Sequence, residues 1–167
     1  MRKTTRQTVT AIFATALLTL TSVGCTSTTA PSSQDTQTAQ TEAEKTSSGA
    51  LGDYAVEIGD YTLTKTYDGK DAIVITMKYT NNSEESMSYM SSLMASAFQD
   101  GVELSTAFIM DDSYDSESQM KELKTGASID VQVAYELSNT TSDVEFEVEE
   151  FISFSDAKVE KTFAIAQ

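Results

Sequence analysis

The sequence of 167 residues contains no histidine and no tryptophan, and it has a single cysteine and a single proline. Without histidine, the commonest general base near neutral pH is excluded. With one cysteine, no disulfide can form within the chain. Histidine and cysteine also supply most ligands of zinc and copper(II) sites. The composition therefore predicts a protein that is not an enzyme and has no transition-metal cofactor.

Basic residues are scarce as well: 11 lysines and arginines stand against 26 acidic residues, giving a formal net charge of −15. Nucleic-acid binding requires a basic surface that neutralises phosphates, so nucleic acid is excluded as a partner. Attraction to anionic lipid headgroups is excluded for the same reason.

The N-terminus has the layout of a secretory signal peptide. Arg2, Lys3 and Arg6 form a positive segment, and residues 11–20 (AIFATALLTL) form a short apolar segment. A transmembrane helix needs about 20 mostly apolar residues, and this run is too short and contains two threonines. We therefore predict a signal peptide over residues 1–24.

The only cysteine follows this segment directly. Ser22, Val23 and Gly24 before Cys25 resemble a bacterial lipobox, in which the thiol receives a diacylglyceryl group and the leader is cleaved between Gly24 and Cys25. A free thiol on an exported protein would be open to oxidation. We predict a palmitate-type lipid anchor on Cys25 that holds the protein at the outer face of the cell membrane. Cleavage would leave eight basic and 26 acidic residues, a net charge of −18.

Residues 25–50 form the second predicted region, a linker. After Cys25 this region contains no Leu, Ile, Val, Phe, Tyr or Met, and Thr, Ser, Ala and Gln dominate it. Such a segment cannot bury enough apolar surface to offset its chain entropy, so we expect it to be disordered. As a flexible coil it would span ~28 Å. The remaining residues, 51–167, have the composition and length of one domain.

Within this domain, apolar and polar residues alternate with the period of a β-strand. The clearest segments are DAIVITMKYT, SIDVQVAYEL and DVEFEVEE, and their inward-facing residues are Ile73, Ile75, Met77, Tyr79, Ile129, Val131, Val133, Tyr135, Leu137, Val144, Phe146 and Val148. The first of these segments is apolar on much of both faces, which predicts a central strand. Hairpin turns are predicted at Asp68-Gly69 and Asp100-Gly101, because Asp-Gly is a common turn sequence. A β-bulge is predicted at Gly59-Asp60, where the alternation changes phase. Seven or eight short strands indicate an all-β sandwich.

Residues 87–98 do not fit this alternation. Met87, Met90, Met94 and Phe98 have helical spacing, and the segment has a low propensity for strand. We predict two short strands around a turn, with one helical stretch as the alternative. The methionines could also supply thioether ligands to copper(I), but methionine more often fills gaps in a core.

One loop has the spacing of calcium ligands. In DDSYDSESQMKE the oxygen-bearing residues fall at positions 1, 3, 5, 7 and 12 of an EF-hand-like loop, namely Asp111, Ser113, Asp115, Glu117 and Glu122. Position 6 is Ser116 where the motif requires glycine, and no flanking helices are predicted. An acidic loop in an acidic protein is more often simply solvated, so calcium is the weaker interpretation.

Three blocks of the domain, YDGKDAIVITMKYTNNS, AFQDGVEL and DDSYDSESQMKELKTGASIDVQVAYEL, resemble a family of Gram-positive surface lipoproteins that carry a domain of unknown function. The resemblance covers residues 54–166 and implies an immunoglobulin-like, telokin-like β-sandwich. It implies no activity and no catalytic or ligand-binding residues. Thr125 stands before Gly126 where this family often has proline.

The sequence thus predicts a membrane-anchored extracellular lipoprotein whose immunoglobulin-like domain is a non-catalytic binding module for a protein, cell-wall polymer or small ligand. A calcium-dependent structural or adhesive domain is the first alternative. A cell-wall hydrolase working with paired carboxylates is the second. Neither the partner nor the oligomeric state follows from the residues.

Overall fold

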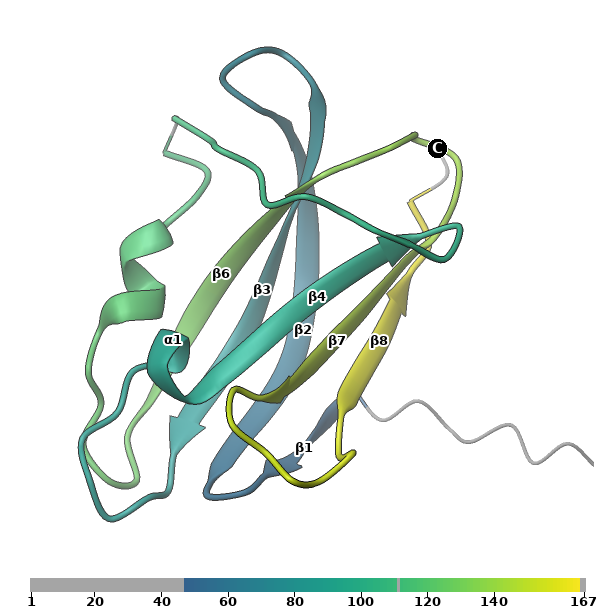
Figure 1. Ribbon diagram of the computed structural model, residues 1–167. Coiled ribbons are helices and arrows are strands. Elements are labelled where there is room, and N and C mark those ends of the chain that lie inside the picture. Colours follow the sequence, from purple (N-terminus) through teal and green to yellow (C-terminus); the bar gives the residue numbers. More distant parts are fainter. Residues whose placement is uncertain (1–46, 111, 166–167) are drawn as a thin grey trace, which may run out of the picture. The chain divides into compact units, whose positions relative to one another are not determined.

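The computed structural model describes residues 47–110 and 112–165. These residues form eight strands in two four-stranded antiparallel sheets, with one short α-helix and one 3₁₀-helix (Figure 1). The predicted all-β sandwich of seven or eight strands is confirmed. The predicted signal peptide, Cys25 and nearly all of the predicted linker lie outside the described residues. No helix in the described part is long and apolar enough to cross a membrane.

The first sheet has the order β1-β2-β3-β6. Its strands are β1 (Ser48–Leu51), β2 (Tyr54–Lys65), β3 (Asp71–Asn81) and β6 (Ser128–Glu136). β1 starts three residues before the predicted domain boundary at residue 51. β3 pairs with β2 on one side and β6 on the other, as its two apolar faces predicted.

The second sheet has the order β5-β4-β7-β8. Its strands are β4 (Leu93–Gln99), β5 (Val102–Glu103), β7 (Val144–Glu150) and β8 (Val159–Phe163). Asp100 and Gly101 join β4 to β5 with φ values of 53° and 75°. Positive φ at both central residues is the signature of a type I′ hairpin turn, which the Asp-Gly pair predicted.

The chain crosses between the sheets in the order of an immunoglobulin domain. β2, β3 and β6 take the places of strands A, B and E, and β4, β7 and β8 take those of C, F and G. The place of strand D is taken by residues 105–107, which contact β6 through one isolated bridge between Thr106 and Tyr135. The immunoglobulin-like prediction is therefore confirmed, with a strand D reduced to a few residues.

The main core lies between the sheets and consists of the inward-facing residues of both. Ile73, Ile75, Met77, Val131 and Val144 are all fully buried. A smaller cluster covers the outer face of β3 and β6, where Ala72, Val74 and Ala134 pack with Ile109. The segment that follows β5 therefore folds over the first sheet, and this explains why β3 is apolar on both faces.

The bulge predicted in β2 is present, because the register with β3 shifts between Ile58 and Tyr61. Gly59 has a structural reason to be glycine. A Cβ atom there would lie 2.9 Å from the backbone oxygen of Thr76, closer than packed atoms allow.

The prediction of two short strands over residues 87–98 is wrong in its first half. Helix α1 (Tyr89–Ser92) leads directly into the single strand β4. The alternative of one helical stretch is wrong as well. The helical spacing of the methionines is not a core pattern, because the side chains of Met90 and Met94 are 52% and 43% exposed. The buried residues of β4 instead alternate, with Leu93, Ala97 and Gln99 facing inward.

Candidate functional site

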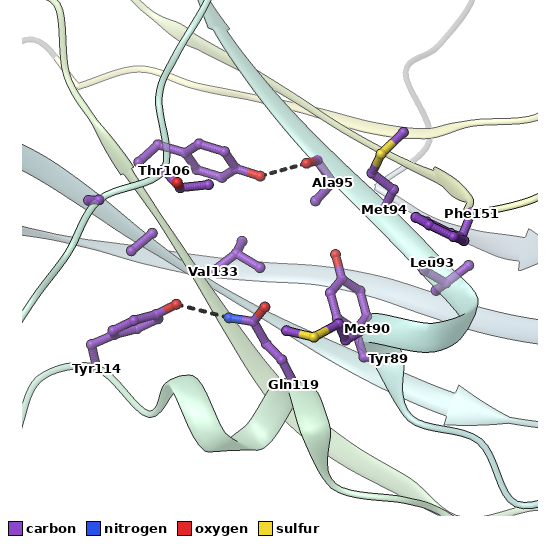
Figure 2. A pocket seen from close by; sticks show the side chains of 13 residues that line it. Tyr89, Met90, Leu93, Met94, Ala95, Thr106, Tyr114, Gln119, Val133 and Phe151 are labelled. Carbon is purple, nitrogen blue, oxygen red and sulfur yellow. Dashed lines mark hydrogen bonds between the residues drawn. The ribbon is translucent and has the colours of Figure 1, made fainter.

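A pocket of about 250 Å³ opens at one side of the sandwich, between β4, β6, α1 and the 3₁₀-helix η1 (Ser116–Met120). Thirteen residues line it: Tyr89, Met90, Leu93, Met94, Ala95, Thr106, Ala107, Tyr114, Gln119, Val133, Ala134, Tyr135 and Phe151. Figure 2 shows these side chains around the space. None of them is charged.

The pocket exists because both strands at this side of the sandwich are short. β5 pairs only with Phe98 and Gln99 at the end of β4, so the edge of β4 nearer α1 is left uncovered. On the first sheet, residues 105–107 contact β6 only around Tyr135, where Ala107 N–H donates to the Ala134 carbonyl at 2.9 Å. Two full-length edge strands would close this side.

Helix η1 forms the lower wall and is held on β6 by hydrogen bonds. Asp115 caps the helix by accepting from Ser118 N–H at 3.2 Å. Gln132 of β6 accepts from Asp115 N–H at 2.7 Å, and its own N–H donates to Ser118 Oγ at 3.2 Å. The amide of Gln119 donates to the Tyr114 hydroxyl at 2.9 Å (Figure 2), which fixes one polar side chain at the pocket wall.

Helix α1 carries Tyr89 into the opposite wall. Ser88 and Ser91 hydrogen-bond each other across the start of the helix, with 2.8 Å between their hydroxyl oxygens. The Tyr89 ring packs edge-on against Tyr79 of β3, with centroids 6.0 Å apart. These contacts set the direction of the Tyr89 hydroxyl, which in Figure 2 points away from α1 toward the middle of the pocket.

The hydroxyl of Tyr89 is buried and has no hydrogen-bond partner among the described residues. The residue as a whole is only 3% exposed. Tyr135, on the facing strand, shows the ordinary arrangement, because its hydroxyl donates to the Ala95 carbonyl at 2.8 Å. A buried polar atom without a partner is uncommon in folded proteins and calls for a partner from outside the chain.

Burial, the largest cause in each case, raises the pKa of the Tyr89, Tyr135 and Tyr114 hydroxyls above the ordinary value for tyrosine. The three phenols therefore stay protonated at physiological pH. They can donate hydrogen bonds but cannot act as bases or anionic nucleophiles.

Four other hollows, also among the described residues, are larger, at about 280, 340, 440 and 570 Å³. Each of them is lined in part by charged side chains, for example Lys65 and Asp71 in one, and Asp53, Glu84 and Glu85 in the largest. Charged and exposed groups of this kind are satisfied by water. The unpartnered Tyr89 hydroxyl singles out the smaller pocket as the candidate site.

A model of the protein family described as a domain of unknown function, DUF5067, matches residues 29–150, which is more than half of the chain. The chain belongs to the DUF5067 family. A search of the curated proteins found no match. Among solved structures, the chain is similar to an NMR structure of a protein from Enterococcus faecalis, with 20% sequence identity and a TM-score of 0.53. That similarity covers 72% of this chain and 90% of the other, and at this identity it concerns the fold alone.

The DUF5067 match includes every residue that lines the pocket except Phe151, which lies one position beyond it. The sequence had predicted that Val133 and Tyr135 face inward, but nothing in it marked Tyr89, Tyr114 or Gln119. The cavity arises from segments far apart in the chain, and no local pattern reports it.

Four predicted calcium ligands of this DUF5067 domain, Ser113, Asp115, Glu117 and Glu122, do not line the pocket, and the fifth, Asp111, falls outside the described residues. Asp115 is occupied as the cap of η1 and lies 3.3 Å from Lys121 Nζ. Ser113, Glu117 and Glu122 are exposed, and η1 replaces the middle of the proposed loop. Among residues 47–110 and 112–165, no three acidic side chains converge as metal ligands would.

Replacing Tyr89 by phenylalanine is expected to raise the free energy of unfolding of the DUF5067 domain by about 1–2 kcal/mol. The substitution keeps the ring and removes a buried hydroxyl whose desolvation is not compensated. Urea denaturation followed by circular dichroism would measure the change.

Tyr135→Phe is the matched control, because it removes a hydroxyl that has a partner. We expect it to lower the free energy of unfolding by about 1 kcal/mol. If Tyr89→Phe lowered stability as Tyr135→Phe does, the Tyr89 hydroxyl would have a partner within the free protein, and the argument for this pocket would be lost.

Proposed function

We propose that this DUF5067 protein is a surface lipoprotein, anchored to the outer face of the cell membrane through Cys25, whose sandwich is a non-catalytic ligand-binding module. The leader and the lipobox-like segment before Cys25 support the anchor, as does the resemblance to Gram-positive surface lipoproteins. The composition of the linker supports a flexible tether between anchor and domain.

The observation that carries the binding role is the buried hydroxyl of Tyr89, which has no partner among the described residues and lies in a pocket without charged side chains. Ligand sites are typically concave and mostly apolar, with a few polar groups that fix the ligand's orientation. The hydroxyl of Tyr89 is a polar group of this kind, as are the hydroxyls of Tyr114 and Tyr135, which are hydrogen-bonded to Gln119 and to the Ala95 carbonyl.

The same pocket favours binding over catalysis. A carboxylate hydrolase needs two acidic side chains facing one cleft, and none of the thirteen lining residues is acidic. The absence of histidine from the whole chain points in the same direction. The cap and ion pair of Asp115 favour a structural role for that residue over calcium binding.

The test is whether compounds from the cell envelope bind in this pocket. The full chain is incubated with fractions of a cell-wall and membrane extract, its melting temperature is measured, and the bound compounds are identified by mass spectrometry. We expect at least one fraction to raise the melting temperature of the wild-type protein.

Two variants of β4 make the test specific. Ala95→Leu fills the pocket and is expected to abolish the rise in melting temperature. Ser96→Leu adds the same side chain on the opposite face of the strand and is expected to retain it. The binding role is refuted if no fraction stabilises the wild type, or if Ala95→Leu responds as the wild type does.

A further inference from the structure

The charge around the pocket limits what it can bind. The lining contains no lysine or arginine that could pair with an anion. The charged residues that act on its phenols are Glu103 near Tyr135 and Asp115 near Tyr114, and both are acidic. The chain as a whole carries a net charge of −15. An anionic ligand would lose its hydration and gain no countercharge, so the pocket selects against it.

The volume limits the size of the ligand. An engineered apolar cavity of ~150 Å³ in another protein accommodates benzene, whereas drug-sized ligands usually occupy pockets of ~300–1,000 Å³. At about 250 Å³, this pocket fits one six-membered ring with a small substituent.

The contact surfaces favour an aromatic ring. Leu93, Val133 and Ala95 supply buried or half-buried apolar walls, and the exposed side chains of Met90, Met94 and Phe151 also line the pocket. Thioether sulfur contacts ring edges favourably, and a flexible methionine adapts to a ligand's outline. Phe151 can add a ring-to-ring contact. Met90, Met94 and Phe151 are all more than 40% exposed, so ligand burial would also remove apolar surface from water.

The hydrogen bonds that the pocket's polar side chains already make determine where a polar atom of the ligand would lie. The Tyr135 hydroxyl donates its proton to the Ala95 carbonyl, and the Tyr114 hydroxyl is hydrogen-bonded to Gln119, from which its oxygen accepts. The Tyr89 proton remains available, because that hydroxyl has no partner in the described part of the chain. A ligand that places one acceptor oxygen there would form the missing hydrogen bond.

We propose that the pocket binds a single uncharged aromatic ring that carries one hydrogen-bond acceptor, directed at the hydroxyl of Tyr89. This inference rests on the proposed binding function and names the chemical class of its ligand. The same chemistry can be presented by a free small molecule or by an aromatic side chain of a peptide.

The experiment uses the full chain with ¹³C-labelled methionine methyl groups, observed by NMR during titration. Met90 and Met94 report on the pocket opening, whereas the buried Met77 and the exposed Met110 do not line it and serve as internal controls. Three ring compounds of nearly equal size are compared: acetophenone is neutral with an acceptor, benzoate is anionic, and cumene has no acceptor.

We expect acetophenone to shift the Met90 and Met94 signals saturably and to leave Met77 and Met110 unchanged. Benzoate should bind at least tenfold more weakly than acetophenone. Tyr89→Phe should weaken acetophenone about tenfold and leave cumene unaffected, because only acetophenone uses the hydroxyl. A capped Ala-Tyr-Ala peptide, compared with capped Ala-Ala-Ala, distinguishes a side chain from a free ligand as the source of the ring.

If benzoate bound as tightly as acetophenone, the proposal that the ligand is uncharged would be overturned. If acetophenone bound Tyr89→Phe and the wild type equally well, the proposed role of the Tyr89 hydroxyl would be overturned. If envelope fractions shifted Met90 and Met94 while all three ring compounds and the tyrosine peptide did not, the ligand class would be wrong and the binding function would stand. If neither the fractions nor the compounds shifted these signals, both proposals would fail.

Discussion

Replacing Cys25 by alanine is expected to remove the lipid adduct and to move the protein from the detergent phase to the aqueous phase in a Triton X-114 partition of whole cells. A single acyl chain gives only a membrane binding constant of ~10⁴ M⁻¹, and the second chain multiplies it by further orders of magnitude. The strongly acidic chain offers no compensating electrostatic attraction to the membrane. Loss of the thiol should therefore lower the ratio of protein in the detergent phase to protein in the aqueous phase by more than ~10⁴-fold.

Ser22→Leu is the matched control for this experiment. It changes the same segment toward the residue usual at that position of a lipobox and leaves the thiol in place, so the protein should stay in the detergent phase. Mass spectrometry of the native protein should find residues 25–167 with a diacylglyceryl group on Cys25. Recovery of an intact, unmodified leader, or equal partition of wild type and Cys25→Ala, would contradict the anchor.

The strands were predictable where apolar residues alternate with polar residues within one segment of the sequence. β6 and β7 follow the alternation of the sequence directly, since the pattern reflects the two faces of a strand. β3 is apolar on both faces and was predictable as a central strand. The hairpin at Asp100-Gly101 and the bulge at Gly59 were predictable too, because these positions impose local backbone geometry.

What could not be predicted depends on how far neighbouring strands extend along each other. The pocket is open because β5 stops after two residues and residues 105–107 form only one bridge with β6. The local sequence pattern does not predict how far either segment pairs with its neighbour. The prediction of two short strands over residues 87–98 was wrong for a related reason. The methionines of this segment face solvent near the opening, so their spacing does not report the core.

The structural roles of two buried amides, Asn81 and Gln99, could not be predicted from the sequence either. Asn81 and Gln99 are 0% and 2% exposed. Each side chain uses its two donors and its oxygen fully: Gln99 donates to the carbonyls of Asn139 and Ser142 and accepts from Ser138 N–H at 2.8 Å. An amide in a strand gives no sign in the sequence that it will hold neighbouring loops together.

Asn81→Leu is expected to lower the free energy of unfolding by about 3 kcal/mol, a substantial part of the ~5–15 kcal/mol typical of a whole domain. The Asn81 amide donates to the carbonyls of Glu85 and Leu123 at 2.7 and 2.8 Å, and its oxygen accepts from Ser83 N–H at 3.0 Å. Leucine has nearly the same size but no polar atoms, so the Ser83 N–H would lose its partner, and the carbonyls of Glu85 and Leu123 would each lose one of their donors.

Asn82→Leu, at the exposed neighbouring position, provides the control and should change stability by less than ~0.5 kcal/mol. Urea denaturation of the full chain measures both variants. Because the loop that Asn81 holds leads into α1, the Asn81→Leu variant should also lose ligand-induced shifts at Met90 in conditions where it is still folded. Stability of Asn81→Leu equal to that of Asn82→Leu would show that water replaces the lost hydrogen bonds, and Asn81 would then have no part in holding Tyr89 at the pocket.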